Sequence, residues 1–160
     1  MKTEMGHEDA KARRKTGNFM GFDPQSIAFR HAEGSPLDDA TEQLVTRIIG
    51  AAIEVHRVLG PGYLEKVYEE ALCIELEHRS LSYQRQKPFE VRYCDRVVGA
   101  GRLDILVEDR VVVELKAVET MTPLFKAQTI SYLRATDVKI ALLINFNVPV
   151  LRQGVKRILL

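Results

Sequence analysis

The segment 101–116 constrains the fold more than any other part of the chain. Apolar runs at 103–107 and 111–115 flank the polar triplet 108–110, which predicts two strands joined by a three-residue hairpin loop. Strand alternation assigns the apolar side chains to two faces: Leu103, Ile105 and Val107 to one, and Leu106 with Val112 to the other. Both faces are therefore expected to be buried, which requires covering elements on each side of the sheet.

Charged side chains interrupt this apolar hairpin. When the strands pair from the residues beside the loop, the count places Asp104 directly opposite Glu114, close enough to share one ligand. Lys116 lies two residues further on and shares that face, with Arg102 opposite it. A two-residue loop would shift the register by one and separate the two carboxylates, so the prediction depends on the loop length.

Two carboxylates at one end of a buried hairpin repel each other unless a cation neutralises them. Hard oxygen ligands suit Mg²⁺ or Mn²⁺, and such an ion can polarise a phosphoryl oxygen and activate water. A lysine beside it can offset developing negative charge. The alternative is a structural salt bridge among Asp104, Glu114 and Lys116, and spacing alone does not decide between these two hypotheses.

The remaining pattern predicts the order α-α-β-β-β-α-β-β, an α/β (α+β-like) fold with a central mixed sheet flanked by helices. The first helix begins near Asp38 or Asp39, either of which can cap it, and stops at the Gly-Pro-Gly of 60–62. A second helix over 63–79 is predicted to have an apolar side traced by Leu64, Val67, Ala71, Ile74 and Leu81.

The strands and the third helix follow from a change of period. Strands are predicted at 89–93, 97–107 and 111–118, with Gly99 and Gly101 marking a bulge or a close approach. Thr122 and Pro123 open a helix to about Arg134. The run 138–144 is typical of a buried strand, and 155–160 predicts a last edge strand, whose free edge is compatible with a homodimer.

Composition limits the classes of protein that fit. Residues 1–36 are polar and end at Gly-Ser-Pro, which predicts a disordered tail before a single domain at 37–160. The latter carries 17 basic and 17 acidic residues, so a polyanion would have to bind a local basic patch or a metal. No apolar run approaches the ~20 residues of a membrane span, and nothing suggests a secreted protein, so a cytoplasmic location is expected. Cys73 and Cys94 are too few for a four-cysteine metal site.

The charged hairpin resembles the core of the PD-(D/E)xK nuclease superfamily, in which an aspartate precedes a Glu-x-Lys sequence. A narrower resemblance, over roughly 38–160, is to the GxxExxY family within it. It rests on five groups of residues: Val55-His56 with Leu59-Gly60-Pro61-Gly62; Gly62-Tyr63-Leu64-Glu65-Lys66-Val67-Tyr68; Gly101-Arg102-Leu103-Asp104; Val113-Glu114-Leu115-Lys116-Ala117-Val118-Glu119; and Gln128-Thr129-Ile130-Ser131-Tyr132-Leu133. One departure is that Leu103 stands where the superfamily has proline before the aspartate.

This resemblance implies a restriction-endonuclease-like core and a role for each matched residue. Asp104 and Glu114 would be metal ligands, with the Leu115 backbone carbonyl as a further one. Lys116 would orient or activate the attacking water, and Glu65, on the helix before the sheet, would complete the acidic cluster.

Four further residues are candidates for contact with nucleic acid or support of the site. Tyr68 is expected to hydrogen-bond a carboxylate or a phosphate, because it shares a helical face with Glu65. Gln128 and Tyr132 resemble a Gln-x-x-x-Tyr pair of exonuclease-like members, with a half-buried helix face as an equally good interpretation. Arg102 is the fourth candidate.

Two other features leave alternatives open. His56 is expected to cap its own helix or to reach the site. Basic residues interleaved with aromatic ones at 79–96 could follow a phosphate backbone or form a solvated face: Arg79, Arg85, Lys87, Arg92 and Arg96.

The sequence therefore predicts a Mg²⁺- or Mn²⁺-dependent nuclease with nucleic acid, DNA in preference to RNA, as its partner. A catalytically silent nucleic-acid-binding protein of the same fold is the alternative, and a protein-interaction module whose charged cluster is structural is a third.

Overall fold

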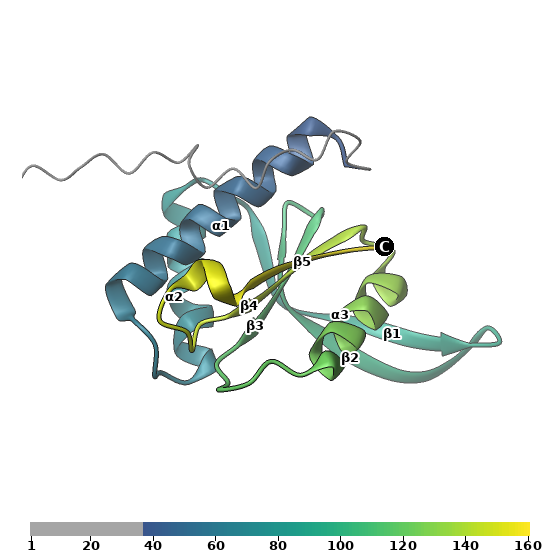
Figure 1. The fold of residues 1–160 in the computed structure, drawn as a ribbon. Coiled ribbons are helices and arrows are strands. Elements are labelled where there is room, and N and C mark those ends of the chain that lie inside the picture. The colour runs from purple at the N-terminus through teal and green to yellow at the C-terminus, as the bar shows by residue number, and fades with distance from the viewer. Residues whose placement is uncertain (1–36) are drawn as a thin grey trace, which may run out of the picture.

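A computed structural model describes residues 37–160, in which five strands form one mixed sheet in the order β1-β2-β3-β4-β5 (Figure 1). The elements are α1 (Asp39–Leu59), α2 (Glu65–His78), β1 (Tyr83–Tyr93), β2 (Arg96–Val107), β3 (Val111–Lys116), α3 (Pro123–Thr136), β4 (Ile140–Asn145), the short 3₁₀ helix η2 (Leu151–Gly154) and β5 (Val155–Leu159). The predicted order of helices and strands is thus confirmed, with η2 added. The tail predicted at 1–36 lies outside the described residues.

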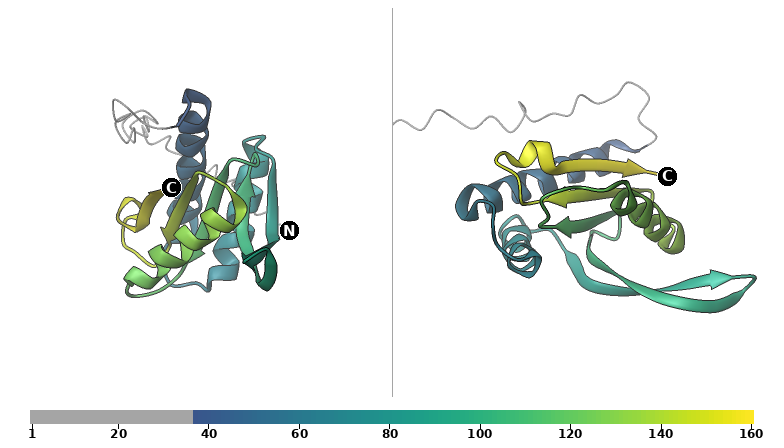
Figure 2. Two further views of the ribbon diagram at one scale, coloured as in Figure 1. Left: turned by 90° about the vertical axis from the view of Figure 1, so that its right-hand side faces the viewer. Right: turned by 60° about the horizontal axis from the view of Figure 1, so that its bottom comes forward.

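The helices cover the sheet from both sides (Figure 2). One apolar cluster joins α1 and α2 to one face of the sheet, and a second cluster joins α3 to the opposite face. Strands β3 and β4 run parallel in the middle, and the other neighbouring strands are antiparallel. All six residues of β4 are buried, which agrees with its uninterrupted apolar sequence. Within 37–160, no helix combines the length and the apolar character that a membrane crossing needs.

Helix α1 begins and ends where its sequence signals indicate. The Asp38 carboxylate accepts a hydrogen bond of 2.7 Å from the Thr41 N–H, which satisfies one of the free donors of the first turn. At the other end Gly60 adopts a positive φ of 67°, and its N–H donates to the His56 carbonyl at 2.8 Å. This left-handed conformation favours glycine, so the chain turns here toward α2.

The buried side of α2 differs from the predicted one. Leu64 and Ile74 are 80% and 51% exposed, whereas the buried row is Tyr68, Leu72 and Leu76, spaced at i, i+4 and i+8. Two apolar rows run along this helix, and local spacing cannot tell which of them is buried. The row with Tyr68 is the one that packs against α1 and β3, because the loop at 60–64 fixes the rotation of the helix.

The three-residue hairpin loop is confirmed. Glu108 and Asp109 adopt positive φ, and the strands pair with Val107 opposite Val111 and with Ile105 opposite Val113. The ladder between β2 and β3 ends at this last pair, so β2 continues beside β1 alone.

Two predictions about β2 fail for this reason. Arg102 pairs with Pro88 of β1 and not with Lys116. Leu103 packs in the α3 cluster and not with Ile105, because alternation is broken at Asp104, where Gln86 on the neighbouring strand has a φ of 49°.

Beyond that point β1 and β2 form a two-stranded arm that leaves the body of the protein (Figures 1 and 2). We call residues 87–102 the β arm. Its base is held by the Phe89 ring, which lies across Gly101 so closely that a Cβ there would collide with the ring. The expectation of a close approach at Gly101 is thereby confirmed, and a register shift between Val91 and Arg92 supplies the bulge.

Candidate active site

The candidate site lies where β2 and β3 separate. The Asp104 N–H donates to the Glu114 carboxylate at 3.3 Å, and the Leu115 N–H donates to the Asp104 carboxylate at 2.8 Å. Side chains thus take the place of the main-chain ladder at this position. The predicted proximity of Asp104 and Glu114 is found, although the contact runs from side chain to backbone.

Burial and like charge both act on Glu114, which is only 4% exposed. Burial, followed by the Asp104 charge, raises the pKa of Glu114 to about 8, although the Asp104 N–H and the Lys116 charge act against this. Burial also raises the pKa of Asp104, and its hydrogen bond from Leu115 opposes that shift. The two carboxylates therefore repel each other in a poorly solvated place, as expected for a site that attracts a cation.

Lys116 is the cation that all these acidic groups share. Burial raises the pKa of Glu65, of Asp104 and of Glu114, and the Lys116 charge opposes each rise, so all three carboxylates lie within electrostatic reach of the lysine. The ammonium group also lies over the Phe125 ring, with 5.2 Å between Nζ and the ring centroid. The ring of α3 thus borders the site on one side and helps to hold the lysine at the end of β3.

Glu65 enters the site from the first turn of α2. Burial raises the pKa of Glu65, and the Asp104 charge raises it further, so the predicted acidic residue on the helix is brought to the strand carboxylates. The loop before it is fixed by Tyr68, whose hydroxyl donates to the Gly60 carbonyl at 2.7 Å and accepts from the Tyr63 N–H at 3.1 Å. Gly62 adopts a φ of 106° in the same loop, which only glycine tolerates well.

Tyr68 therefore has a different position from the expected one. It is fully buried and stacks on Phe146 with ring centroids 4.5 Å apart. Its hydroxyl bonds the loop and not a carboxylate, so Tyr68 fixes the loop that leads into Glu65.

An open cleft of about 620 Å³ reaches two of the acidic residues, Glu65 and Asp104. It is lined by Leu64, Glu65, Lys66, Glu69, Arg85, Gln86 and Asp104. Glu69 accepts hydrogen bonds from Arg85 at 2.8 Å and from Gln86 at 3.1 Å, which ties α2 to β1 across the floor of the cleft. Arg85 also pairs with Glu70 at 2.6 Å.

The aromatic pair of α3 lies at the opposite border. Tyr132 is half-buried against Phe89, with ring centroids 5.0 Å apart. Burial raises the pKa of Tyr132, and so do the Glu114 and Asp104 charges, which places its hydroxyl within electrostatic reach of the site. A side-chain hydrogen bond with Gln128, which is exposed, lowers the pKa of the same hydroxyl. The predicted pair is brought to the site, whereas Arg102 is exposed on the β arm.

The oxygen donors around Asp104 are of the kind that bind a divalent ion. Among residues 37–160, no three Asp, Glu, His or Cys side chains already converge at ligand spacing. The Leu115 N–H points toward β2, and in an extended strand the carbonyl of the same residue points to the same side, which is the side of Asp104. One or two carboxylates with a carbonyl, the rest being water and substrate, is a usual Mg²⁺ environment, so the residues fit such an ion.

The sequence did not predict that Gln86 and Asn145 help to shape the candidate site. Gln86 gives no signal, because nothing in its surroundings predicts a positive φ within a strand. Asn145 had a detectable signal, namely an amide directly after a buried apolar run. Its side chain bonds both the N–H and the carbonyl of Val118 and so anchors the chain that leaves β3. The His56 side chain neither caps its own helix nor reaches the site, because its Nε2 contacts the Val148 carbonyl at 2.8 Å.

A mixed five-stranded sheet with flanking helices in this order defines a restriction-endonuclease-like fold. The comparisons with known proteins agree with it. A family model described as the PD-(D/E)XK nuclease superfamily matches residues 42–158, and this chain belongs to that superfamily. Its members generally use divalent metals and act on nucleic acids. Neither curated proteins nor solved structures gave a match.

Proposed function

We propose that this protein is a Mg²⁺- or Mn²⁺-dependent nuclease that hydrolyses phosphodiester bonds in DNA. The observation that carries the proposal is the meeting of Asp104, Glu114 and Lys116 at the point where β2 and β3 separate. Three buried or half-buried charges of this kind have a cost in a folded protein, and a chemical role accounts for it.

Each residue has a part in the proposed reaction. Asp104, Glu114 and the Leu115 carbonyl would hold the ion, with Glu65 completing the acidic cluster from α2. A bound ion would polarise a phosphoryl oxygen and lower the pKa of a bound water. Lys116 would orient the attacking water and offset the negative charge that develops on the phosphate.

The narrower classification is also a proposal. In the GxxExxY sequence, Gly62 provides the positive φ, Glu65 lies within electrostatic reach of Asp104, and Tyr68 fixes the loop between them. One site thus uses all three residues of the motif, which supports placing the chain in that family. The cytoplasmic location and the homodimer expected from the sequence stay predictions.

Cleavage of end-labelled single- and double-stranded DNA and RNA tests the proposal, with Mn²⁺, Mg²⁺ or EDTA present. We expect metal-dependent cutting that falls at least about a hundredfold in Lys116→Ala, since loss of a group that positions a proton transfer costs about this much. Lys156→Ala removes an exposed lysine on β5 and should cut normally. Full activity of Lys116→Ala would refute the mechanism, and binding without cutting by the wild type would indicate the catalytically silent alternative.

A further inference from the structure

The β arm has properties that the candidate site does not explain. An isolated two-stranded hairpin is marginally stable in water, and this one exposes a set of apolar side chains beyond its base. Val91, Tyr93, Val97 and Val98 are 41%, 73%, 50% and 62% exposed. Adjacent exposed apolar residues of this kind mark interaction surfaces.

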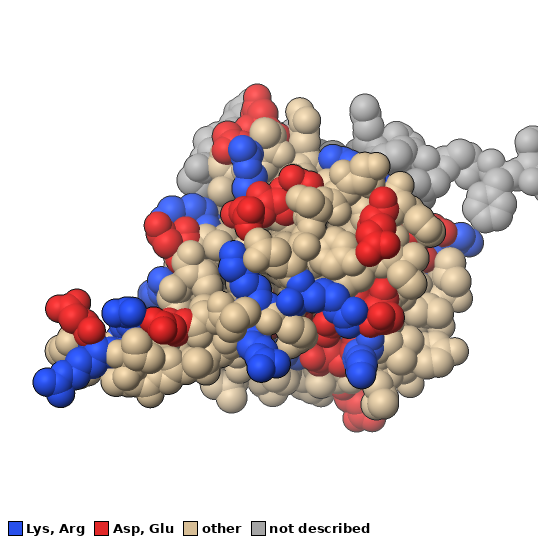
Figure 3. Space-filling model, turned by 180° about the vertical axis from the view of Figure 1, so that it is seen from behind, with Lys and Arg blue, Asp and Glu red and all other residues tan. Residues whose placement is uncertain are grey.

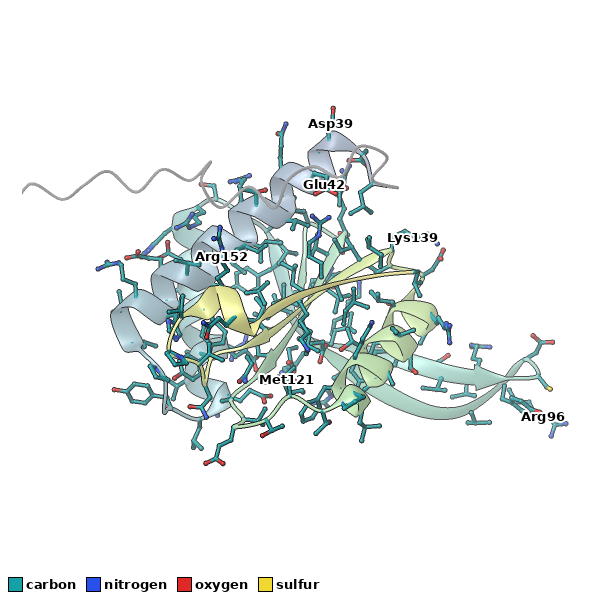
Figure 4. The ribbon with its side chains drawn as sticks, in the orientation of Figure 1. Asp39, Glu42, Arg96, Met121, Lys139 and Arg152 are labelled. Carbon is teal, nitrogen blue, oxygen red and sulfur yellow. The ribbon has the colours of Figure 1, made fainter. Side chains whose placement is uncertain are left out.

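The β arm differs in net charge from the rest of the described residues. The arm carries four basic and two acidic residues, whereas the remaining described residues carry 13 basic and 15 acidic ones. Figure 3 shows basic side chains, with a few acidic ones between them, along the arm where it protrudes from the body, and Figure 4 places Arg96 at its far tip. The positive part of a slightly negative molecule is therefore its protruding element, which favours a polyanionic partner over a second copy of the chain.

The edges of the β arm also argue against pairing with another strand. Pro88 interrupts the edge of β1, because proline has no N–H to donate. On β2, the register passes from Gly99 to Val97, so Val98 is the extra residue of a bulge. Proline and bulges are features that stop edge strands from adding a further strand. The arm is thus suited to a partner that contacts its faces.

Position and length relate the β arm to the site. Leu103 precedes Asp104 at the base of the arm, and Arg96 begins β2 at the tip, so the arm extends about 23 Å from the site at ~3.3 Å per residue. That length corresponds to about seven base pairs. A two-stranded ribbon fits the major groove of B-form DNA, whereas the major groove of duplex RNA is too deep and narrow to admit it.

We propose that the β arm docks duplex DNA by entering the major groove beside the scissile phosphate. Arg96 would contact the phosphate backbone, and so would Arg92, which exchanges its exposed ion pair with Glu90 for a phosphate. This inference rests on the proposed nuclease function and names its substrate as double-stranded DNA. The arm would hold the duplex, and the carboxylates and Lys116 would act on the phosphate at its base.

Binding measured in EDTA separates the arm from the chemistry. The full chain is titrated with a fluorescent DNA duplex of about 30 base pairs, longer than the arm. We expect Arg92→Ala/Arg96→Ala to bind roughly tenfold more weakly and its salt dependence to lose about two units of slope. The control Lys139→Ala/Lys156→Ala removes two exposed lysines beside or on β4 and β5, the far side of the sheet, and should bind normally. Equal affinity of the two double variants would overturn the proposal.

The exposed Cys94 in the turn of the arm provides a second measurement on the wild-type protein, since the chain's other cysteine is buried. Duplex DNA should slow alkylation of Cys94 severalfold, whereas duplex RNA and single-stranded DNA should not. Protection of Cys94 without nucleic acid in a dimeric protein would instead assign the arm to a second copy. Protection by duplex DNA without metal-dependent cutting would retain the arm and refute the nuclease, and cutting without protection would do the reverse.

Discussion

Two buried glutamates of this protein, Glu42 and Glu114, differ in the charges that lie beside them. Glu42 on α1 is 5% exposed, and Arg157 of β5 lies 2.7 Å from its carboxylate. Glu114 on β3 is 4% exposed, but its carboxylate accepts a hydrogen bond from the backbone N–H of Asp104, and burial followed by its acidic neighbours raises its pKa. The fold can therefore neutralise a buried carboxylate with an arginine, as it does for Glu42 on α1 and, in the cleft, for Glu69 with Arg85, but no arginine among the described residues does so for Glu114. At the site it leaves an excess of negative charge, which a divalent ion can neutralise.

Breaking the balanced pair should have the largest effect on stability. We expect Glu42→Gln to lower the free energy of unfolding by about 3 kcal/mol, because removal of one partner leaves the Arg157 charge uncompensated in a largely buried place. DNA cleavage should be unchanged. Urea unfolding measures the difference.

Glu54→Gln is the matched control, on the same helix and in an exposed pair with Arg57. It should unfold like the wild type. A loss of stability as small in Glu42→Gln as in Glu54→Gln would remove the contrast between Glu42 and Glu114.

The unbalanced site should respond to metal. Saturating Mg²⁺ or Mn²⁺ should raise the free energy of unfolding by about 2.7 kcal/mol at a concentration of 100 Kd and the melting temperature by roughly 5–10 °C. Thermal unfolding with and without EDTA gives the shift. The double variant Asp104→Asn/Glu114→Gln should lose it, and Glu42→Gln should keep it, since its carboxylate lies outside the site. An equal shift in the double variant would locate the metal elsewhere.

The sequence predicted the hairpin and its charges better than it predicted the helix beside them. The triplet 108–110 set a loop of three residues, and the loop set the register that brings Asp104 beside Glu114. Strand period and turn length are local, so they can be counted. The exposed Leu64 and the buried Tyr68 could not be ranked, because the rotation of α2 depends on the hydrogen bonds of the loop that precedes it.

The end of the β2–β3 ladder was the least predictable feature. Counting pairs assigned Arg102 to Lys116, and nothing in the sequence shows that pairing stops at Ile105. The separation follows from carboxylates that occupy main-chain donors on both strands, together with the positive φ of Gln86. The same separation creates the place where the candidate site lies. The irregular position was thus also the functional one.

The smallest of these effects has the opposite sign to that of Glu42. In the metal-free protein, Glu114→Gln should stabilise the fold at pH 8 by on the order of 2 kcal/mol, about half of what the pKa shift corresponds to, because an amide replaces a protonated carboxyl group imperfectly. The folded state raises the pKa of Glu114 from 4.5 to about 8, so it binds this proton more firmly than the unfolded chain does. The contribution of Glu114 to the free energy of unfolding is therefore fully present below pH 4.5 and is lost as the pH rises through about 8. Glutamine removes this loss.

Melting temperatures from pH 5 to pH 8.5 in EDTA provide the measurement. The wild type and Glu114→Gln should differ little at the acid end, and the variant should be the more stable at the alkaline end. Glu42→Gln should be the less stable across the whole range, because its partner is permanently charged. A Glu114→Gln protein less stable than the wild type at pH 8 would mean that the carboxylate is already balanced without metal, and that the two glutamates do not differ in the way proposed.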